Sequence, residues 1–234
     1  DMGITAENVA RKYEISRDQQ EQFALRSQAR ARDAIAAGRL EAEIVPIQTR
    51  DGVVSADGCP RPDPPAEGLA GLKPAFDAAE GTVTAGTSSP LTDGAASVLV
   101  CSEAYADRKG LPKLARIRSI AISGCEPEVM GLGPILSSRK AMERAGITIE
   151  DVGVVELNEA FASQSIACAR ELGVRDATLN IDGGAIALGH PLGATGARIV
   201  GKAAQLLERE GARYALATQC IGGGQGIATV LERI

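Results

Sequence analysis

The stretch from Gly183 to Arg198 reads GGAIALGHPLGATGAR and holds the single histidine of the chain, His190. Glycines surround this histidine, and backbone without side chains lets a ligand approach closely. A helical pattern over 197–210 follows directly, so a polar side chain and backbone N–H groups can converge on a substrate there. A glycine-rich turn with an incidental histidine is the simpler interpretation of the stretch taken alone.

Strands and helices alternate regularly around this stretch. Strands are predicted over 115–122, 152–157, 178–181, 214–219 and 226–231, and helices over 135–145, 161–172 and 197–210. Alternation of this length predicts parallel strands covered by helices, and the last two strands, joined by glycines, predict an antiparallel pair. The fold class is therefore α/β, with a mixed sheet.

The first hundred residues have a less regular pattern. A short helix capped by Thr5 is predicted over 5–13, and a capping box of Ser16 and Gln19 opens a longer helix that stops at Gly38. The remaining predicted elements are a short strand over 43–48, an irregular segment over 51–75, a brief strand and turn over 81–90, a buried strand over 95–101 and a helix over 103–109.

Composition narrows the class of protein. The chain has 234 residues, 44% of them hydrophobic and 24% charged, which is ordinary for a soluble globular protein. A net charge of −5 gives no electrostatic reason to expect nucleic acid or an anionic membrane as partner. The five cysteines form no CxxC pair, which indicates reduced thiols in a cytoplasmic compartment, and one histidine excludes a His-rich metal site. No nucleotide-binding GxGxxG follows a strand.

Three polar side chains stand where predicted strands end. Asn158 follows the strand over 152–157, His190 follows the one over 178–181, and Cys220 follows the one over 214–219. Successive parallel strands end at one edge of a sheet, where ligands usually bind, so the three side chains can meet. Each also has an ordinary interpretation: a helix N-cap for Asn158, a core histidine for His190 and a small buried apolar residue for Cys220.

Several motifs together resemble those of the thiolase family, in the same order and over essentially the whole chain. The motifs are MGITAENV from Met2, 81–86, MGLGP from Met130, NEAFA from Asn158, the His190 stretch, and CIGGG from Cys220. The sequence departs from the family at Asp182, where asparagine is common, and at Thr87. Residues 87–89 and 225–228 favour the degradative, β-oxidation type of enzyme over the short-chain biosynthetic type.

The resemblance implies a fold and a division into domains. It implies most of a loop domain over 1–91, the last strand and helix of a thiolase N-terminal half over 92–112, and a complete C-terminal βαβαβαββ half over 113–234. The family's nucleophilic cysteine lies upstream of all of these, and none of the five cysteines here has a matching context. The isolated chain is accordingly expected to be inactive.

The resemblance also implies roles in cleaving 3-ketoacyl-CoA with CoA, or in the reverse Claisen condensation. His190 would activate the absent nucleophile, Asn158 would hold a water beside the enolate oxygen, and Cys220 would be the general acid and base. The backbone N–H of Gly222 would join an oxyanion hole. A free thiol titrates near pH 8.5, so modest activation would suit Cys220 to this task.

Binding roles follow from the same resemblance. Arg61 would meet the CoA nucleotide phosphate. The small residues Ala85, Gly86 and Ser89 would let pantetheine lie close to the backbone. Three larger residues, Met2, Met130 and Phe161, would line the acyl pocket, although each could otherwise be an ordinary core residue. The implied partners are acyl-CoA, CoA, the N-terminal half and further copies in a homodimer or homotetramer, with no cofactor beyond CoA. Two alternatives stay open: a ketoacyl synthase-like enzyme, which would carry His or Asn in place of Cys220, and a non-catalytic fragment that binds CoA or a partner.

Overall fold

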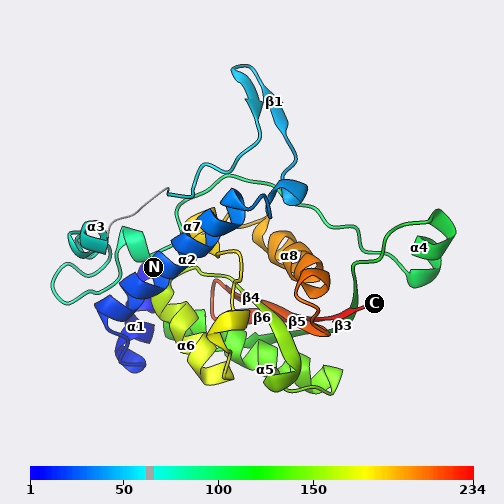
Figure 1. The fold of residues 1–234 in the computed structure, drawn as a ribbon. Coiled ribbons are helices and arrows are strands. Elements are labelled where there is room, and N and C mark those ends of the chain that lie inside the picture. The colour runs from blue at the N-terminus through cyan, green and yellow to red at the C-terminus, as the bar shows by residue number, and fades with distance from the viewer. Residues whose placement is uncertain (62–65) are drawn as a thin grey trace.

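The computed structural model describes residues 1–61 and 66–234 (Figure 1). The helices are α1 (Met2–Lys12), α2 (Arg17–Ala36), α3 (Ala66–Ala70), α4 (Glu103–Lys109), α5 (Gly133–Ala145), α6 (Ala162–Leu172), α7 (Ala185–Leu188) and α8 (Thr195–Arg209). The strands are β1 (Ile47–Thr49), β2 (Gly52–Val54), β3 (Ala115–Gly124), β4 (Val152–Leu157), β5 (Tyr214–Ile221) and β6 (Gln225–Arg233).

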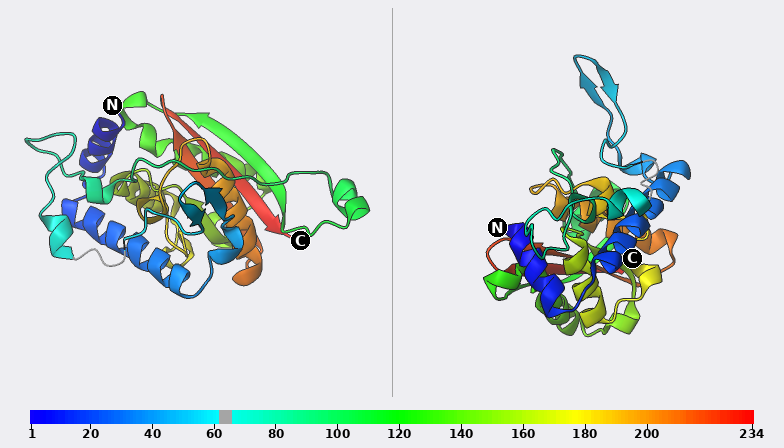
Figure 2. Two further views of the ribbon diagram at one scale, coloured as in Figure 1. Left: turned by 90° about the horizontal axis from the view of Figure 1, so that it is seen from above. Right: turned by 90° about the vertical axis from the view of Figure 1, so that its left-hand side faces the viewer.

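Four strands form the central sheet, in the order β3-β6-β5-β4 (Figure 2). β4 and β5 are parallel, whereas β6 is antiparallel to both β5 and β3. The predicted mixed sheet and the antiparallel pair at its end are therefore confirmed, and the predicted limits of β4 match the structure to the residue.

Helices cover both faces of this sheet. α5 packs on β3 and β6 from one side, and α8 packs on β4 and β5 from the other. Alternation along β5 explains the two layers, because Leu216 belongs to the apolar cluster beneath α5 and α6 while its neighbour Ala217 belongs to the cluster beneath α8. On α8, the buried Ile199, Ala203 and Leu206 follow the spacing of an amphipathic helix.

The predicted last residues of the helices over 103–109, 135–145 and 161–172 match the structure. Gly110, Gly146 and Gly173 end α4, α5 and α6 with φ of +63°, +69° and +70°, the left-handed geometry that favours glycine. The capping box of Ser16 and Gln19 at the start of α2 is confirmed.

The first helix begins earlier than predicted. α1 starts at Met2 because the Asp1 carboxylate accepts the Gly3 N–H at 3.2 Å and caps the helix. Thr5 is not the cap, since its hydroxyl donates back to the Met2 carbonyl at 2.7 Å from inside the first turn.

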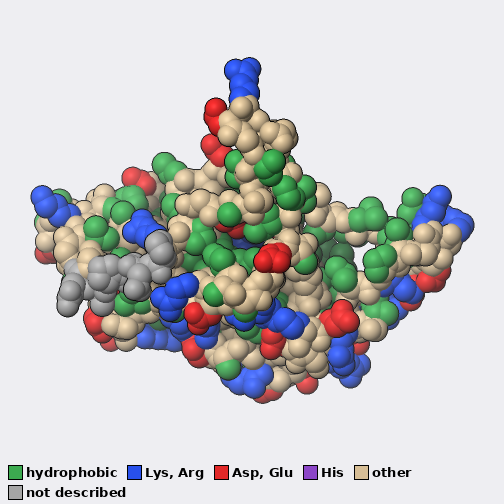
Figure 3. Space-filling view, turned by 45° about the horizontal axis from the view of Figure 1, so that its top comes forward, with side chains coloured by type: hydrophobic (Ala, Val, Ile, Leu, Met, Phe, Trp, Pro, Cys, Tyr) green, Lys and Arg blue, Asp and Glu red, His purple; other side chains and the backbone are tan. Residues whose placement is uncertain are grey.

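The segment 95–101 is not the predicted buried strand. It is extended, pairs with no strand among the described residues and leads along the surface to α4. Leu99 and Val100 are 73% and 65% exposed, and hydrophobic side chains are visible along this arm (Figure 3). An apolar sequence needs a hydrogen-bonded neighbour to become a strand, and the described part of the chain offers this segment none.

Three further expectations need correction. The strand predicted over 178–181 is reduced to a single bridge between Val155 and Leu179, because a 3-10 turn (Asp176–Thr178) includes its first residue and the backbone turns at Asn180, whose φ is +44°. The strand predicted over 43–48 is shifted to β1, which forms an exposed hairpin with β2. The strand predicted within 81–90 is reduced to two isolated bridges, from Thr84 to Pro74 and from Ser88 to Phe161, with a 3-10 turn between them.

The segment 51–75 also holds more structure than expected, since β2 and the short α3 lie within it. Its residues 62–65, with Pro62, Pro64 and Pro65, lie outside the described part of the chain. Among the described residues, no helix combines the length and the apolar character that crossing a bilayer requires.

Candidate functional site

The carboxyl ends of the parallel strands β4 and β5 share one edge of the sheet. Asn158 directly follows β4, and its backbone N–H donates to the Thr218 carbonyl on β5 at 3.0 Å. Cys220 lies two residues further along β5. Two of the three predicted polar residues therefore stand at neighbouring strand ends, as the strand order requires.

The third residue, His190, is held by the first residue of α8. Its Nδ1 lies 2.6 Å from the Thr195 hydroxyl, which lies 2.9 Å from the Pro191 carbonyl. A hydroxyl has one proton, and a carbonyl oxygen can only accept. We therefore assign the Thr195 proton to the bond with Pro191, so that Thr195 accepts from Nδ1–H and Nε2 of His190 is left as a proton acceptor.

α8 also connects this histidine to the end of β5. A Cβ placed on Gly196, the residue after Thr195, would lie 3.7 Å from the side-chain nitrogen of Gln219, which precedes Cys220. The first turn of α8 therefore lies beside the end of β5.

Gly189 shows why glycine precedes the histidine. Its φ is +92°, and a Cβ there would lie 2.7 Å from the Thr92 hydroxyl oxygen. The same oxygen accepts the backbone N–H of His190 at 3.3 Å. The group that lies close to this glycine is the chain's own segment around Thr92.

Burial keeps His190 in its neutral form. Burial, and then the charge of Arg198, lower the pKa of His190 from its ordinary value. A neutral imidazole with a free Nε2 is the form that can accept a proton near pH 7. Because the folded-state pKa is lowered, this form persists to a more acidic pH than for a free histidine.

Cys220 has the opposite character to the one expected. It packs against a small apolar cluster made of Ala6, Val83, Ala160 and Phe161. Burial raises the pKa of the Cys220 thiol to about 12. The expectation of an activated thiol is therefore wrong for this structure, because apolar surroundings disfavour the thiolate. At neutral pH, Cys220 is a protonated thiol that can donate.

Asn158 has a side chain with no partner. It is 1% exposed, yet neither its amide nitrogen nor its amide oxygen has a hydrogen bond within the chain. An unpartnered buried amide is costly unless water or a ligand meets it. The N-cap interpretation of Asn158 fails, since α6 begins only at Ala162 and its capping residue is Phe161.

Gly222 lies in the exposed turn between β5 and β6. The two following residues, Gly223 and Gly224, have φ of +86° and +91°, so this tight connection depends on glycine. The turn places the backbone of Gly222 two residues beyond Cys220.

A buried carboxylate that sequence reasoning did not single out lies beside Asn158. The Oε2 atom of Glu159 accepts the Ser27 hydroxyl at 2.6 Å and the Ile186 N–H at 3.2 Å, and Oε1 accepts the Asn180 amide at 2.8 Å. Burial raises the pKa of Glu159, although these hydrogen bonds favour the charged form and oppose that rise. Glu159 thus binds the end of β4 to α2 and to α7. The motif showed a carboxylate here but could not indicate its partners, which lie far along the chain.

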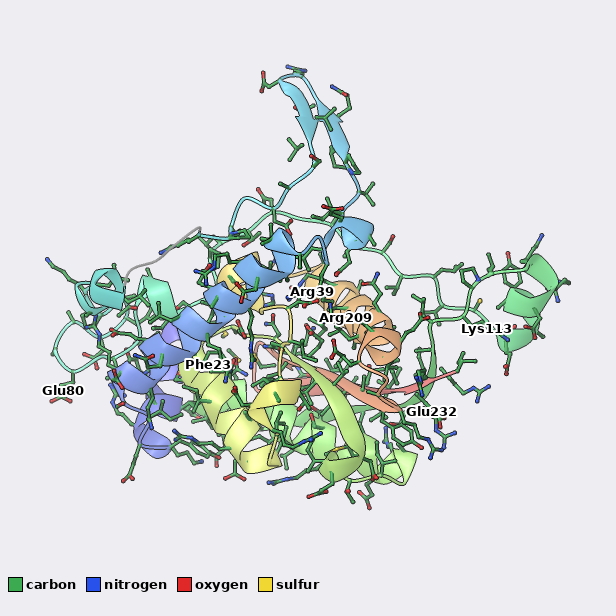
Figure 4. The ribbon with its side chains drawn as sticks, viewed as in Figure 1. Phe23, Arg39, Glu80, Lys113, Arg209 and Glu232 are labelled. Carbon is green, nitrogen blue, oxygen red and sulfur yellow. The ribbon has the colours of Figure 1, made fainter. Side chains whose placement is uncertain are left out.

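Asp182 anchors the beginning of the His190 stretch. Its carboxylate is fully buried and lies 2.9 Å from Arg39, 2.6 Å from Lys202 and 2.6 Å from Arg209. Figure 4 shows Arg39 and Arg209 close to each other, one from the turn that follows α2 and one from the last residue of α8. Although burial opposes it, hydrogen bonds from Arg209 and Lys202 hold the pKa of Asp182 at about 2. The departure from asparagine at this position therefore gives an ion cluster.

A second buried carboxyl, Glu156, lies on β4 two residues before Asn158. It is 2% exposed, and its Oε1 atom has no hydrogen-bond partner. Burial raises the pKa of Glu156 to about 8, although Arg198 and Lys202 favour its charged form. Glu156 is therefore mostly protonated at neutral pH.

The small residues expected to form a pantetheine strip run beside the end of β4. Ser88 forms a bridge with Phe161, and the Ser89 N–H donates to the Ala160 carbonyl at 3.0 Å. Gly86 is buried in the same strip, and Ala85 is exposed. Phe161 belongs to the apolar cluster that Cys220 contacts, so the strip and the thiol adjoin.

The other predicted binding residues have different surroundings. Met2 is 43% exposed at the start of α1, one turn before Ala6 of the Cys220 cluster. Met130 is 4% exposed, and its carbonyl accepts the Cys125 thiol at 3.7 Å. Arg61 is an exposed residue whose backbone N–H donates to a buried glutamine of α2.

No metal site accompanies these residues in the described structure. Within 1–61 and 66–234, no three His, Cys, Asp or Glu side chains gather closely enough to hold a metal ion.

Comparison with known proteins adds a family relationship. The family model described as "Thiolase, C-terminal domain" matches residues 111–233, and "Thiolase, N-terminal domain" matches residues 1–104. A 3-ketoacyl-CoA thiolase of Vibrio parahaemolyticus is 53% identical over 240 residues, which cover 99% of this chain and 61% of that protein. One of Pseudoalteromonas translucida is 52% identical over 241 residues, covering 100% of this chain and 62% of that protein.

Solved structures agree with these sequences. Human mitochondrial 3-ketoacyl-CoA thiolase matches with a TM-score of 0.93 and 40% identity, covering 100% of this chain and 59% of that chain. An acetyl-CoA acetyltransferase of Bacillus anthracis matches with a TM-score of 0.93 and 42% identity, covering 100% and 60%. The chain thus spans about three fifths of the length of the relatives it matches.

Proposed function

The chain belongs to the thiolase family, and from that premise we propose that the whole protein is an acyl-CoA acyltransferase that cleaves 3-ketoacyl-CoA with CoA or runs the reverse condensation. The observation that carries the proposal is the character of three groups: an unpartnered amide and a protonated thiol at the neighbouring ends of β4 and β5, and a neutral imidazole with a free Nε2 just before α8, the helix that packs on both strands.

The proposed reaction uses these groups in turn. Nε2 of His190 takes the proton of a nucleophilic cysteine supplied by the rest of the protein, whose sulfur attacks the keto carbon. The carbon–carbon bond breaks, and the leaving enolate takes a proton from the Cys220 thiol. The resulting Cys220 thiolate is a strong base because it is buried, and it takes the proton of the incoming CoA thiol. That CoA sulfur then releases the shortened acyl group from the enzyme.

The amide of Asn158 and the backbone of Gly222 have supporting roles in this proposal. Asn158 holds a water beside the enolate oxygen, and this role gives hydrogen-bond partners to the unpartnered nitrogen and oxygen of its amide. The N–H of Gly222 contributes to the second oxyanion hole. Arg61 meets the CoA phosphate, Ala85, Gly86 and Ser89 accompany pantetheine, and Met2, Met130 and Phe161 line the acyl pocket. A human relative of 39% identity has been solved in complex with CoA, which supports a CoA substrate.

The remaining parts of the proposal concern the state of the protein. We place it in the cytoplasm, in fatty-acid degradation, as a homodimer or homotetramer with no cofactor besides CoA. The domain division at 91 and 112 is part of the same proposal.

The direct test is thiolysis by the full-length protein, which includes the part its relatives carry beyond this chain. Acetoacetyl-CoA and longer 3-ketoacyl-CoA thioesters should be cleaved in the presence of CoA, with formation of acetyl-CoA measured by chromatography. The 234-residue chain alone should give no turnover. Lack of activity in the full-length protein with every chain length would favour a non-catalytic CoA-binding role, and turnover by the chain alone would refute the need for an external nucleophile.

The Thr195–His190 hydrogen bond makes a separate prediction. Thr195→Val in the full-length protein removes the acceptor of Nδ1–H and should lower kcat about threefold to tenfold, with KM nearly unchanged. Steady-state kinetics measure both constants. Thr195→Ser keeps the hydroxyl and is the matched control, so equal losses in the two variants would show that the hydrogen bond does not position His190.

A further inference from the structure

Two adjacent side chains of α2, Ser27 and Gln28, reach across to the His190 stretch. The Ser27 oxygen accepts the Gly184 N–H at 3.1 Å while its proton goes to Glu159. Gln28 is 8% exposed, and its Nε2 donates to the Ile186 carbonyl at 3.3 Å. α2 therefore holds α7 at two successive points.

α7 needs such external bonds. It has four residues, Ala185–Leu188, and leads directly through Gly189 to His190. A single helical turn is unstable in water, so its position depends on tertiary contacts. The Ile186 carbonyl is one of these contact points, and its partner is the Gln28 amide.

The same amide has a second partner on another segment. The Arg61 backbone N–H donates to Oε1 of Gln28 at 3.1 Å. Gln28 thus donates to one segment and accepts from another, with Arg61 33 residues and Ile186 158 residues away in sequence. The exposed side chain of Arg61 extends from a loop whose backbone is fixed at this point.

We propose that Gln28 is a positioning residue that couples the segment carrying Arg61 to the loop carrying His190. The coupling rests on the proposed function, in which Arg61 meets the CoA phosphate and His190 accepts a proton. Because one planar amide makes both bonds, a displacement of the Arg61 segment changes the orientation of the group that holds α7. Binding of the CoA nucleotide and placement of the imidazole then depend on each other.

Substitutions can separate the two bonds. Gln28→Leu has a similar size and removes both. Gln28→Glu keeps an acceptor for the Arg61 N–H but loses the donor to Ile186. Gln20→Leu is the matched control, because Gln20 is a fully buried amide of the same helix whose hydrogen bonds go to Thr82 at 2.9 Å and to the Ile15 carbonyl at 3.5 Å, and neither acceptor belongs to the two segments.

Hydrogen exchange of the full-length protein measures the coupling without an activity assay. In Gln28→Leu, the backbone amides of Arg61, Leu188 and Gly189 should exchange about threefold to tenfold faster. In Gln28→Glu, Arg61 should stay protected while Leu188 and Gly189 exchange faster. Gln20→Leu should leave all three amides unchanged. Unaltered exchange in Gln28→Leu, or the same pattern in Gln20→Leu, would overturn the proposal.

Kinetics provide the second readout. Gln28→Leu should raise KM for CoA and lower kcat, each about threefold to tenfold, whereas Gln28→Glu should lower kcat with KM for CoA retained. A purely structural defect would reduce the folded fraction and leave KM unchanged, and that result would contradict the coupling. If the wild-type protein has no thiolysis activity, the proposed function fails, and hydrogen exchange still decides whether Gln28 couples the two segments.

Discussion

Cys220→Ser in the full-length protein is expected to lower kcat/KM for thiolysis by about 100- to 10,000-fold, the usual contribution of a general acid–base group. The thiol of Cys220 has a pKa of about 12 because it is buried against apolar side chains. It is protonated in the resting state and strongly basic once it has donated. A serine hydroxyl at the same place ionises far less readily, so it cannot give its proton to the enolate and then recover one from CoA.

Steady-state thiolysis of acetoacetyl-CoA measures this loss. Thermal unfolding should show a nearly unchanged Tm, since serine replaces one sulfur atom beside a small cluster. His190→Ala should produce a loss of similar size by removing the acceptor for the nucleophile's proton. Near-normal rates in either variant would contradict the role assigned to that residue. Cys125→Ser changes a second thiol whose pKa is raised by burial, and it serves as the control for serine substitution.

Glu156→Gln should make the chain more stable, by an amount that grows between pH 5 and pH 8. The folded-state pKa of Glu156 is raised to about 8, while in the unfolded chain a glutamate titrates near pH 4.3. Between these values the native state holds a proton that the unfolded state has lost. Stability of the wild-type chain therefore falls as pH rises through this window, by at most about 1.4 kcal/mol for each pH unit.

Glutamine keeps the shape of the protonated carboxyl and does not titrate, so the variant avoids this loss. Urea denaturation at pH 5, 6, 7 and 8 measures the difference, which we expect to grow by about 4 kcal/mol at most between pH 5 and pH 8. Glu143→Gln, on the exposed side of α5, controls for the removal of one negative charge. A difference that stays constant with pH, or that favours the wild-type chain at pH 8, would show that Glu156 is ionised in the folded state.

Features decided by neighbouring residues were predictable from the sequence. The glycines that end α4, α5 and α6, the capping box of α2 and the limits of β4 depend on spacing within a few residues. The meeting of Asn158 and Cys220 at one edge followed from strand order alone. These signals are local or follow a simple rule of sheet topology, so they can be interpreted without knowing which distant residues make contact in the fold.

Features decided by distant residues were not predictable. The apolar run over 95–101 has the pattern of a buried strand, but a pattern does not supply the neighbour that a strand requires. The partners of Glu159 and Gln28 lie up to 158 residues away, and polar residues on a helix usually face water. The raised pKa of Cys220 depends on an apolar cluster assembled from α1, a loop and the end of β4.

The exposed run at 95–101 has a practical meaning for anyone who prepares this chain by itself. Val98, Leu99 and Val100 are 42%, 73% and 65% exposed on an extended backbone that pairs with no strand in the described part of the chain. Such a segment promotes aggregation, because two copies can pair as edge strands and bury their apolar side chains against each other. Dilute samples, low salt and solubilising fusion tags are the natural way to handle it.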